Sequence, residues 1–258
     1  MTSKLKRLYL YLILLFLYAP IIILIIYSFN ESKYRVWTNF SFKWYVELFQ
    51  DGQIMAALSN TILVALVSSV LSTILGTAAA IGIQSLRKWQ RSTVMNITML
   101  PVLNPDIVTG IALMLLFFMA KLPTGRLTLI LAHMAFSVPY VILSVLPKLN
   151  QADNRTYEAA LDLGATPLLA TLKVTIPEIM PGVITGFLMA FTLSIDDFII
   201  SYFTTGPGVE NLSILIYNAA KKGVSPSINA LSALMFAVIL LLLIVINIRT
   251  HKDTKENA

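Results

Sequence analysis

Three aspartates stand inside apolar stretches of this sequence, where a bare carboxylate is costly if the stretch crosses a membrane. Asp106 interrupts one stretch, and the adjacent pair Asp196 and Asp197 interrupts another. Ionisable groups at membrane depth face the interior of a helix bundle or a water-filled cavity, where they pair with other polar groups or mark a transport path. For Asp197, a solute path and structural pairing both remain open. For Asp106 and Asp196, a buried hydrogen bond or a helix cap is favoured.

Helical spacing separates the two adjacent aspartates. If the surrounding stretch is one continuous helix, Asp196 and Asp197 point about 100° apart, so we do not expect both to face one cavity. Asp197 then shares a polar stripe with Ala190, Ser194 and Ser201. Carboxylates beside aromatic faces suit a polyammonium solute, through charge-assisted and cation–π contacts, although helix packing is the simpler explanation of the aromatic residues. The candidate path residues are Asp197, Ser194, Phe198, Tyr202, Asp196 and Asp106.

Residues that could catalyse a reaction are sparse. The chain has no cysteine, which excludes a thiol nucleophile and a thiolate metal site. Of its two histidines, His251 lies in the C-terminal tail, and His133 stands alone in an apolar stretch, where we expect a packed or hydrogen-bonded side chain rather than a metal ligand. No glycine-rich phosphate-binding loop is present. The sequence therefore predicts neither an enzyme nor an ATPase.

The composition predicts the kind of secondary structure that positions the aspartates. Of the 258 residues, 57% are hydrophobic and 12% are charged, against about 25% charged in an ordinary soluble domain. A hydrocarbon layer of about 30 Å takes about 20 helical residues to cross, and the backbone must satisfy its own hydrogen bonds there. We therefore predict an all-α polytopic membrane protein with six transmembrane helices. They cover about residues 8–29, 54–84, 93–120, 127–146, 180–203 and 228–248.

The third and fifth of these stretches are less regular than the others, because aspartates interrupt them, and in the third Asn104-Pro105-Asp106 could cap a broken helix. We expect a single membrane core over residues 54–248. The first helix and its outer loop, residues 1–53, are expected to be peripheral to this core, and residues 249–258 form a tail.

Lysine and arginine counts predict the orientation. With the N-terminus inside, the inner segments hold 12 of these residues and the outer loops hold 7, so six crossings leave both termini in the cytoplasm. The basic residues behind the net charge of +6 are spread over the chain as these topology signals. They do not form one basic stripe, which argues against nucleic-acid binding. The first apolar stretch is too long for a signal peptide, and no A-x-A-like cleavage site follows it.

The inner segment 150–177 contains signals for two short helices. Asp153 or Asn154 can cap a first helix that stops at Gly164, and Thr166-Pro167 can start a second helix over residues 168–175 that ends near Pro177. The resulting elbow carries several leucines. It could fold against its own bundle, or it could fit a groove on another protein.

The elbow also carries a family motif. Glu158-Ala159-Ala160, three residues, Gly164, nine residues and Val174-Thr175-Ile176-Pro177 resemble the EAA loop of the membrane subunits of ABC importers. Valine at 174 and isoleucine at 176 depart from the family's isoleucine and leucine, and both are apolar exchanges. The resemblance implies the type I ABC importer permease fold and an elbow that docks on a cytoplasmic ATPase subunit. The implied ATPase-coupling residues are Glu158, Ala159, Ala160, Leu161, Gly164, Ala165 and Pro177.

A narrower resemblance extends over nearly the whole chain. Residues 18–23 (YAPIII), 28–30 (SFN), 105–108 (PDIV), 191–198 (FTLSIDDF), 205–207 (TGP) and 223–226 (GVSP) look like permease subunits of spermidine/putrescine importers of the PotC type. This resemblance implies a bacterial cytoplasmic (inner) membrane protein. Its implied partners are a second homologous permease, a pair of ATPase subunits and an extracytoplasmic polyamine-binding protein. No cofactor is expected on this chain, because ATP and Mg would bind to the ATPase.

Two other functions remain as alternatives. An ion-coupled secondary transporter of a cationic solute would also use membrane aspartates and broken helices, although no inverted duplication is evident in the sequence. A scaffold or receptor subunit would tolerate replacement of the membrane carboxylates without loss of flux.

Overall fold

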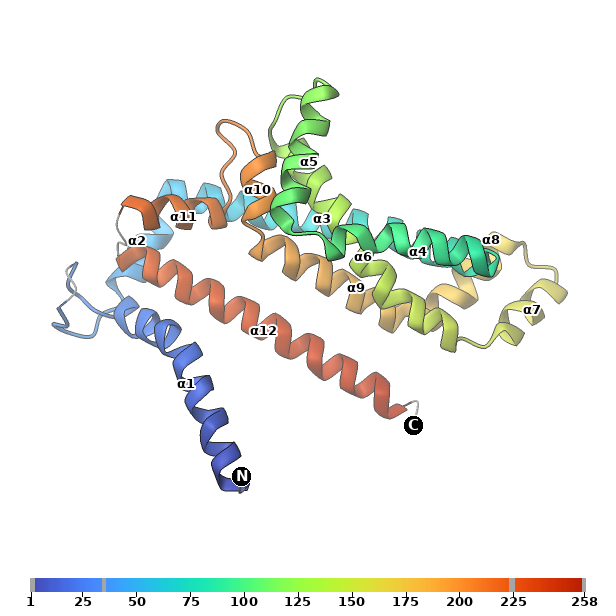
Figure 1. The fold of residues 1–258 in the computed structure, drawn as a ribbon, viewed down its shortest axis with the longest axis horizontal. Coiled ribbons are helices and arrows are strands. Elements are labelled where there is room, and N and C mark those ends of the chain that lie inside the picture. Colours follow the sequence, from blue (N-terminus) through green and yellow to red (C-terminus); the bar gives the residue numbers. More distant parts are fainter. Residues whose placement is uncertain (1–2, 34–35, 223–225, 257–258) are drawn as a thin grey trace. The chain divides into compact units, whose positions relative to one another are not determined.

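The computed structural model describes residues 3–33, 36–222 and 226–256, and these form helices joined by short loops (Figure 1). The only β pairing among them is a single bridge between Asn30 and Phe40. Of the segment 223–226, which supports the family resemblance, residues 223–225 lie outside the described part. The elements are α1 (Ser3–Ser28), α2 (Lys43–Gln50), α3 (Gly52–Ser85), α4 (Lys88–Leu103), α5 (Asp106–Met119), α6 (Arg126–Gln151), α7 (Asn154–Asp162), α8 (Pro167–Ala170), the π-helical segment η1 (Thr171–Thr175), α9 (Ile176–Asp196), α10 (Ile199–Thr204), α11 (Leu212–Lys222) and α12 (Pro226–Glu256).

Long apolar helices confirm the predicted fold class. Within the described residues, five helical segments are long and apolar enough to cross a membrane, and a bent pair, α4 with α5, raises the number to as many as six. The five segments are Tyr9–Ser28, Gly52–Ser85, Arg126–Gln151, Pro167–Asp196 and Pro226–Ile244.

The third predicted span is not one continuous helix. Its two halves, α4 and α5, meet at an angle of 104°. Asn104 has an extended backbone (ψ 145°), and Pro105 precedes the first residue of α5. Proline lacks an N–H and disfavours a helical conformation in the residue before it, which explains the break at this point. The expectation of a broken helix at Asn104-Pro105-Asp106 is therefore confirmed.

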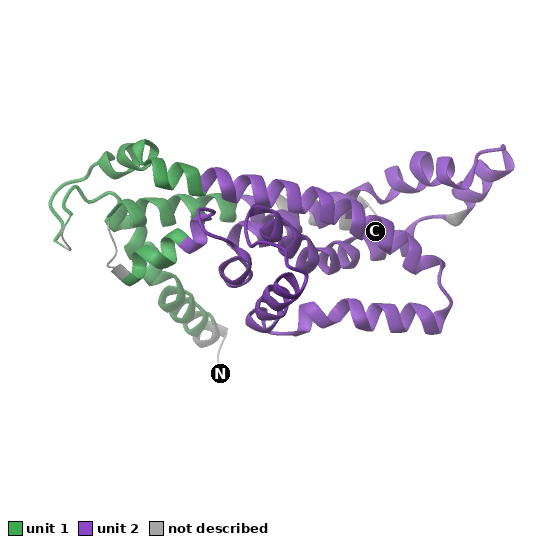
Figure 2. Cartoon of the chain, turned by 90° about the horizontal axis from the view of Figure 1, so that it is seen from above, with its two compact units in different colours: residues 1–57, 215–241 green, residues 58–214, 242–258 purple. Residues whose placement is uncertain are grey.

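The chain divides into two compact units (Figure 2), of which the first comprises Met1–Ala57 and Leu215–Leu241. Within this unit, Asn30 organises the loop after α1. The Trp44 indole N–H donates to the Asn30 carbonyl oxygen (2.6 Å), and Asn30 Nδ2 donates to the Val36 carbonyl oxygen (2.9 Å). The Ser28 and Tyr45 hydroxyl groups lie 2.7 Å apart, so α2 is tied to the end of α1.

The second unit, Leu58–Ile214 with Leu242–Ala258, contains both candidate sites, and α6 runs through its core. Glycines allow two neighbouring helices to approach α6 closely. A Cβ on Gly76 of α3 would lie 2.7 Å from Val141 Cβ, and one on Gly182 of α9 would lie 2.9 Å from the Ser144 carbonyl oxygen. Such small residues are typical of close helix packing in membranes. The buried core cluster is Ala80, Ile83, Val141, Ile142, Val145, Leu146, Leu149, Ile179 and Ala190.

The fifth predicted span, 180–203, has different limits in the structure. The apolar helical segment begins at Pro167, and α9 ends at Asp196, so the expected stop near Pro177 is wrong. Pro177 lies in the first turn of α9, where its missing N–H is tolerated. The π-helical segment η1 carries the chain from α8 into α9, with the Ile176 N–H donating to the Thr171 carbonyl oxygen.

Candidate functional site

A cavity of about 420 Å³ in the second unit brings three carboxylates together. Asp106 comes from the first turn of α5, Asp196 is the last residue of α9, and Asp197 follows it. None of the cavity's ten lining residues is lysine or arginine, so the wall carries only negative charge. The other lining residues are Phe136, Tyr140, Thr192, Leu193, Phe198, Ile199 and Ile200.

The two adjacent aspartates line the same cavity, and the expectation that they would not is wrong. That expectation assumed one helix through both residues. The helix ends at Asp196, and Asp197 takes an extended conformation (ψ 126°) before α10 begins at Ile199. The helical rotation of about 100° per residue therefore does not apply across this step, and the proposed stripe from Ala190 to Ser201 is interrupted.

The Asp197 carboxylate holds the start of α10. Its Oδ1 accepts the Ile200 N–H (3.2 Å), and its Oδ2 accepts the Ser201 N–H (2.7 Å). The first amide groups of a helix lack partners within the helix, and a carboxylate is a favourable acceptor for them. The His133 Nε2 atom lies 3.5 Å from Asp197 Oδ2, and only 9% of the Asp197 side chain is exposed. Asp197 thus has a structural role and also lines the cavity.

Asp106 and Asp196 are exposed in the chain by itself, so the first of the two roles expected for them, a buried hydrogen bond, is excluded. Asp106 is the first residue of α5, but the N-cap of this helix is Pro105 and no side chain caps it through a hydrogen bond, so the expected capping role is not observed. Exposed carboxylates at a cavity wall remain available to a cationic solute.

The remaining path candidates divide into two groups. Phe198 lines the cavity with the aspartates, whereas Ser194 and Tyr202 do not. Ser194 is buried, and its hydroxyl lies 2.5 Å from His133 Nδ1. Tyr202 is 48% exposed, and its ring packs against Phe198 with centroids 5.5 Å apart.

Three residues of α6 belong to this site but were not among the candidates. Phe136 and Tyr140 supply aromatic walls, and His133 contacts Asp197 from the buried side. The expectation of a hydrogen-bonded His133 is confirmed, but its partners could not be foreseen. The helical spacing of these three residues places them on one face of α6, but nothing in the sequence indicates that α9 covers this face. Among the described residues, no group of three His, Asp or Glu side chains is arranged to hold a metal ion.

The second candidate site is the elbow within the segment 150–177. The Asp153 carboxylate accepts the Arg155 N–H (3.0 Å), which confirms Asp153 as the cap of α7. The Gly164 N–H donates to the Leu161 carbonyl oxygen (2.9 Å), and the Ala165 N–H donates to that of Ala160 (3.0 Å). These two bonds form a Schellman motif, and Gly164 has the positive φ (90°) that this helix ending requires. Gly164 therefore ends the helix as predicted.

The outer surface of the elbow is apolar and exposed. Leu163 is 89% exposed and Leu168 is 71% exposed, and α7 projects beyond the ends of α6 and α9 (Figure 1). Of the coupling candidates, Glu158, Ala159, Gly164 and Pro177 are exposed, whereas Ala160, Leu161 and Ala165 are half-buried. The elbow's exposed leucines do not pack against its own bundle.

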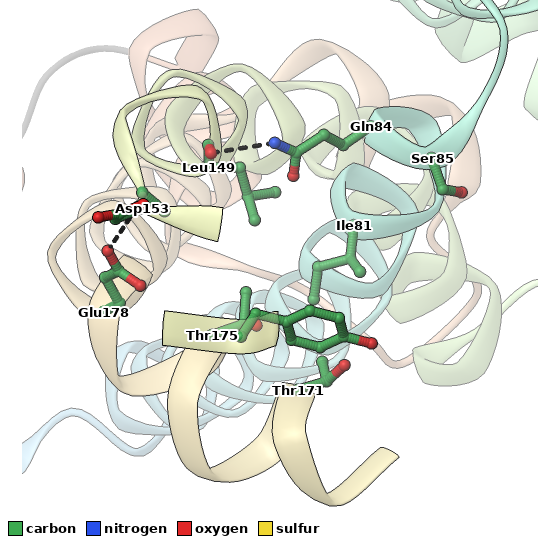
Figure 3. A pocket seen from close by; sticks show the side chains of 10 residues that line it. Ile81, Gln84, Ser85, Leu149, Asp153, Thr171, Thr175 and Glu178 are labelled. Carbon is green, nitrogen blue, oxygen red and sulfur yellow. Dashed lines mark hydrogen bonds between the residues drawn. The ribbon is translucent and has the colours of Figure 1, made fainter. Parts of the chain in front are cut away.

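A pocket of about 320 Å³ lies between the base of the elbow and the helices that carry it (Figure 3). The Asp153 N–H donates to Glu178 Oε1 of α9 (2.9 Å), and Gln84 of α3 donates to the Leu149 carbonyl oxygen of α6 (3.0 Å). The side chains of Tyr157, Thr171 and Thr175 also line the pocket. The base of the elbow is thus hydrogen-bonded to α9.

Comparison with known proteins shows that the chain is similar to membrane components of transport systems. Residues 72–251 match the family model described as "Binding-protein-dependent transport system inner membrane component". The putrescine transport system permease protein PotI of Escherichia coli (strain K12) is 40% identical over 87% of this chain and 83% of its own length. The spermidine/putrescine transport system permease protein PotC of Haemophilus influenzae is 34% identical, over 96% of this chain and 97% of its own.

Solved structures show the same fold. A chain of a bacterial ABC transporter involved in the import of the acidic polysaccharide alginate superposes with a TM-score of 0.67 at 19% identity, covering 98% of both chains. A chain of the MetNI methionine ABC transporter superposes with a TM-score of 0.57 at 18% identity, covering 80% of this chain and 96% of that one. The helical fold is that of an ABC importer permease, and the chain belongs to the family of inner membrane components of binding-protein-dependent transport systems.

Proposed function

We propose that this permease carries polyamines, putrescine or spermidine, and that it forms half of their translocation path. The observation that carries the proposal is the cavity at which Asp106, Asp196 and Asp197 meet the aromatic rings of Phe136 and Tyr140 without a basic residue in the wall. Ammonium groups bind carboxylates through charge-assisted hydrogen bonds and aromatic faces through cation–π attraction. The relatives named for putrescine and spermidine/putrescine transport support the same class of solute.

The energy for transport would come from a partner. We infer that a pair of cytoplasmic ATPase subunits binds ATP and Mg, that a second homologous permease supplies the other half of the path, and that an extracytoplasmic binding protein delivers the polyamine. This chain would itself bind no cofactor and catalyse no reaction.

We propose that the elbow is the surface to which the ATPase binds. Exposed apolar side chains such as Leu163 and Leu168 are available to a groove on a partner, and Glu158 beside them offers a charge. The hydrogen bond from Asp153 to Glu178 would transmit the movement of the docked elbow to α9, and α9 ends at the cavity. The remaining coupling residues in this proposal are Ala159, Ala160, Leu161, Gly164, Ala165 and Pro177.

The chain is a multi-pass protein of the inner membrane, in keeping with its family and its apolar helices. We propose that both termini and the elbow lie in the cytoplasm, since lysine and arginine are more frequent on that side.

Uptake measurements test the proposed substrate. The complete transporter is produced in cells that lack their own polyamine importers, and the uptake of radiolabelled putrescine and spermidine is measured. Competition by an excess of a neutral or an anionic solute of similar length should have no effect, whereas a competing diamine should reduce uptake. Failure of the complete transporter to carry either polyamine would refute the proposal.

The energy source is tested in the same cells. With an ATPase subunit that cannot hydrolyse ATP, uptake should stop, and dissipating the proton gradient while ATP is maintained should leave uptake intact. The opposite pattern would indicate an ion-coupled secondary transporter.

A further inference from the structure

A buried histidine joins the two sides of the break between α9 and α10. His133 of α6 is 1% exposed. Its Nδ1 atom lies 2.5 Å from the Ser194 hydroxyl of α9, and its Nε2 atom lies 2.8 Å from the Ser201 hydroxyl of α10. The same Nε2 atom is 3.5 Å from Asp197 Oδ2, between the two helices. One imidazole ring therefore contacts both helix ends and the carboxylate that links them.

The Asp197 carboxylate favours a proton on Nε2, the ring nitrogen of His133 that faces it. The Ile214 N–H donates to Asn211 Oδ1 (3.0 Å), so Asn211 Nδ2 is the atom that donates to Ser201 Oγ (2.7 Å). With a proton on Nε2, His133 donates toward Ser201 and the Asp197 carboxylate. The Ser194 hydroxyl then donates to Nδ1, which has no proton in this tautomer. In this tautomer both ring nitrogens have hydrogen-bond partners, as a buried polar network requires.

This arrangement affects the cavity through Asp197. The carboxylate accepts two amide groups of α10 on one side and faces His133 on another, and it also lines the cavity. Asp196, at the same wall, is exposed. The position of the Asp197 carboxylate is therefore set by a buried cluster, whereas the Asp196 carboxylate is exposed.

We propose that His133 is a positioning residue that holds the Asp197 carboxylate at the cavity wall and thereby sets the apparent affinity of the transporter for its cationic solute. The inference rests on the proposed polyamine path, and it assigns to His133 a role in substrate recognition without contact with the substrate. At metal sites, residues that hydrogen-bond to the ligating side chains without contacting the metal change the affinity by about 10-fold or more when they are removed.

Uptake kinetics of the complete transporter in cells test this role, with putrescine as the probe and rates normalised to the amount of this chain in the membrane. His133→Leu should raise KM by about 10-fold, the lower end of the range for such orienting groups, and should leave the maximal rate within about twofold. His133→Gln restores an amide donor and a carbonyl acceptor, so its KM should return to within about threefold of the unaltered value.

Two further variants separate positioning from folding. Ser194→Ala removes the hydroxyl that fixes the ring at Nδ1 without adding volume, so it should also raise KM, although Ser194 does not line the cavity. Ser137→Ala is the matched control, because Ser137 lies one turn further along α6, is equally buried, and its hydroxyl has no hydrogen-bond partner among the described residues. This control should leave both KM and the maximal rate unchanged.

A double-mutant cycle with Asp197→Asn completes the test. If His133 acts through Asp197, the KM of the double variant His133→Leu/Asp197→Asn should equal that of Asp197→Asn alone. Multiplied effects on KM, or an unchanged KM in both His133→Leu and Ser194→Ala, would overturn the inference while the unaltered transporter still carries putrescine. Absence of polyamine uptake by the unaltered transporter would instead refute the proposed function, and the inference with it.

Discussion

Replacing Gly164 by leucine tests how the elbow is held for docking. Gly164 has φ 90°, and its N–H and that of Ala165 complete the Schellman ending of α7. A residue with a Cβ in the left-handed region costs about 1–2 kcal/mol. Nothing lies within 4 Å of a Cβ built on Gly164, so the cost is backbone strain rather than a clash. Strain of this size corresponds to a factor of about 5–30 in a conformational equilibrium.

Binding to the ATPase is the property that should respond. If only a fraction of the chains keeps the elbow in its docking conformation, the apparent Kd rises by the inverse of that fraction. We therefore expect the Kd of the purified ATPase for the permease complex in nanodiscs to rise by up to about 30-fold in Gly164→Leu. Gly164→Asn should have a smaller effect, because asparagine adopts the left-handed region more readily.

Gly82→Ala provides the control for this experiment. Gly82 is an exposed glycine in the last turns of α3 that also has no atom within 4 Å of a built Cβ, but it has ordinary helical geometry. The Gly82→Ala variant should bind the ATPase with the same Kd as the unaltered chain. Equal affinities for Gly164→Leu and the unaltered permease, in membranes that contain equal amounts of each, would show that the elbow's shape is not what the ATPase recognises.

Three further changes have defined expectations. Glu158→Lys reverses an exposed charge on α7 and should reduce co-purification of the ATPase while the chain remains inserted, so unchanged co-purification and uptake would contradict docking at this face. Asp197→Asn removes a cavity charge and one strong acceptor for α10, and it should lower putrescine uptake with the complex intact; normal flux and normal substrate-stimulated ATP hydrolysis would exclude Asp197 from the path. Gly182→Ala places a Cβ 2.9 Å from both the Ser144 carbonyl oxygen and Lys148 Cγ, so it should destabilise the α6–α9 contact by about 1–3 kcal/mol, measured as a lower thermal unfolding midpoint in detergent. An unchanged midpoint would show that these two helices can separate at little cost.

The elbow was largely predictable because each of its signals acts within a few residues. Asp153 bonds an amide two residues away, Thr166 bonds one three residues away, and Gly164 closes the helix through carbonyl groups three and four residues before it. Its second half was predicted incorrectly, since Pro177 was expected to end a helix. In the structure, this proline lies in the first turn of α9, at the end of η1. Proline removes a hydrogen bond from a helix but does not determine whether the chain continues beyond it.

The sequence by itself determined the membrane character of the chain, the apolar segments and the local capping of the elbow. These depend on the transfer of side chains from water to lipid and on hydrogen bonds between near neighbours, and both are encoded in contiguous residues. Only the tertiary structure decided that Asp106, Asp196 and Asp197 share one cavity, and that His133 lies behind it. These residues come from α5, α6, the end of α9 and the break after it, and they meet only because particular helix faces pack together. That choice of faces depends on long-range packing, which the periodicity of a single helix does not specify.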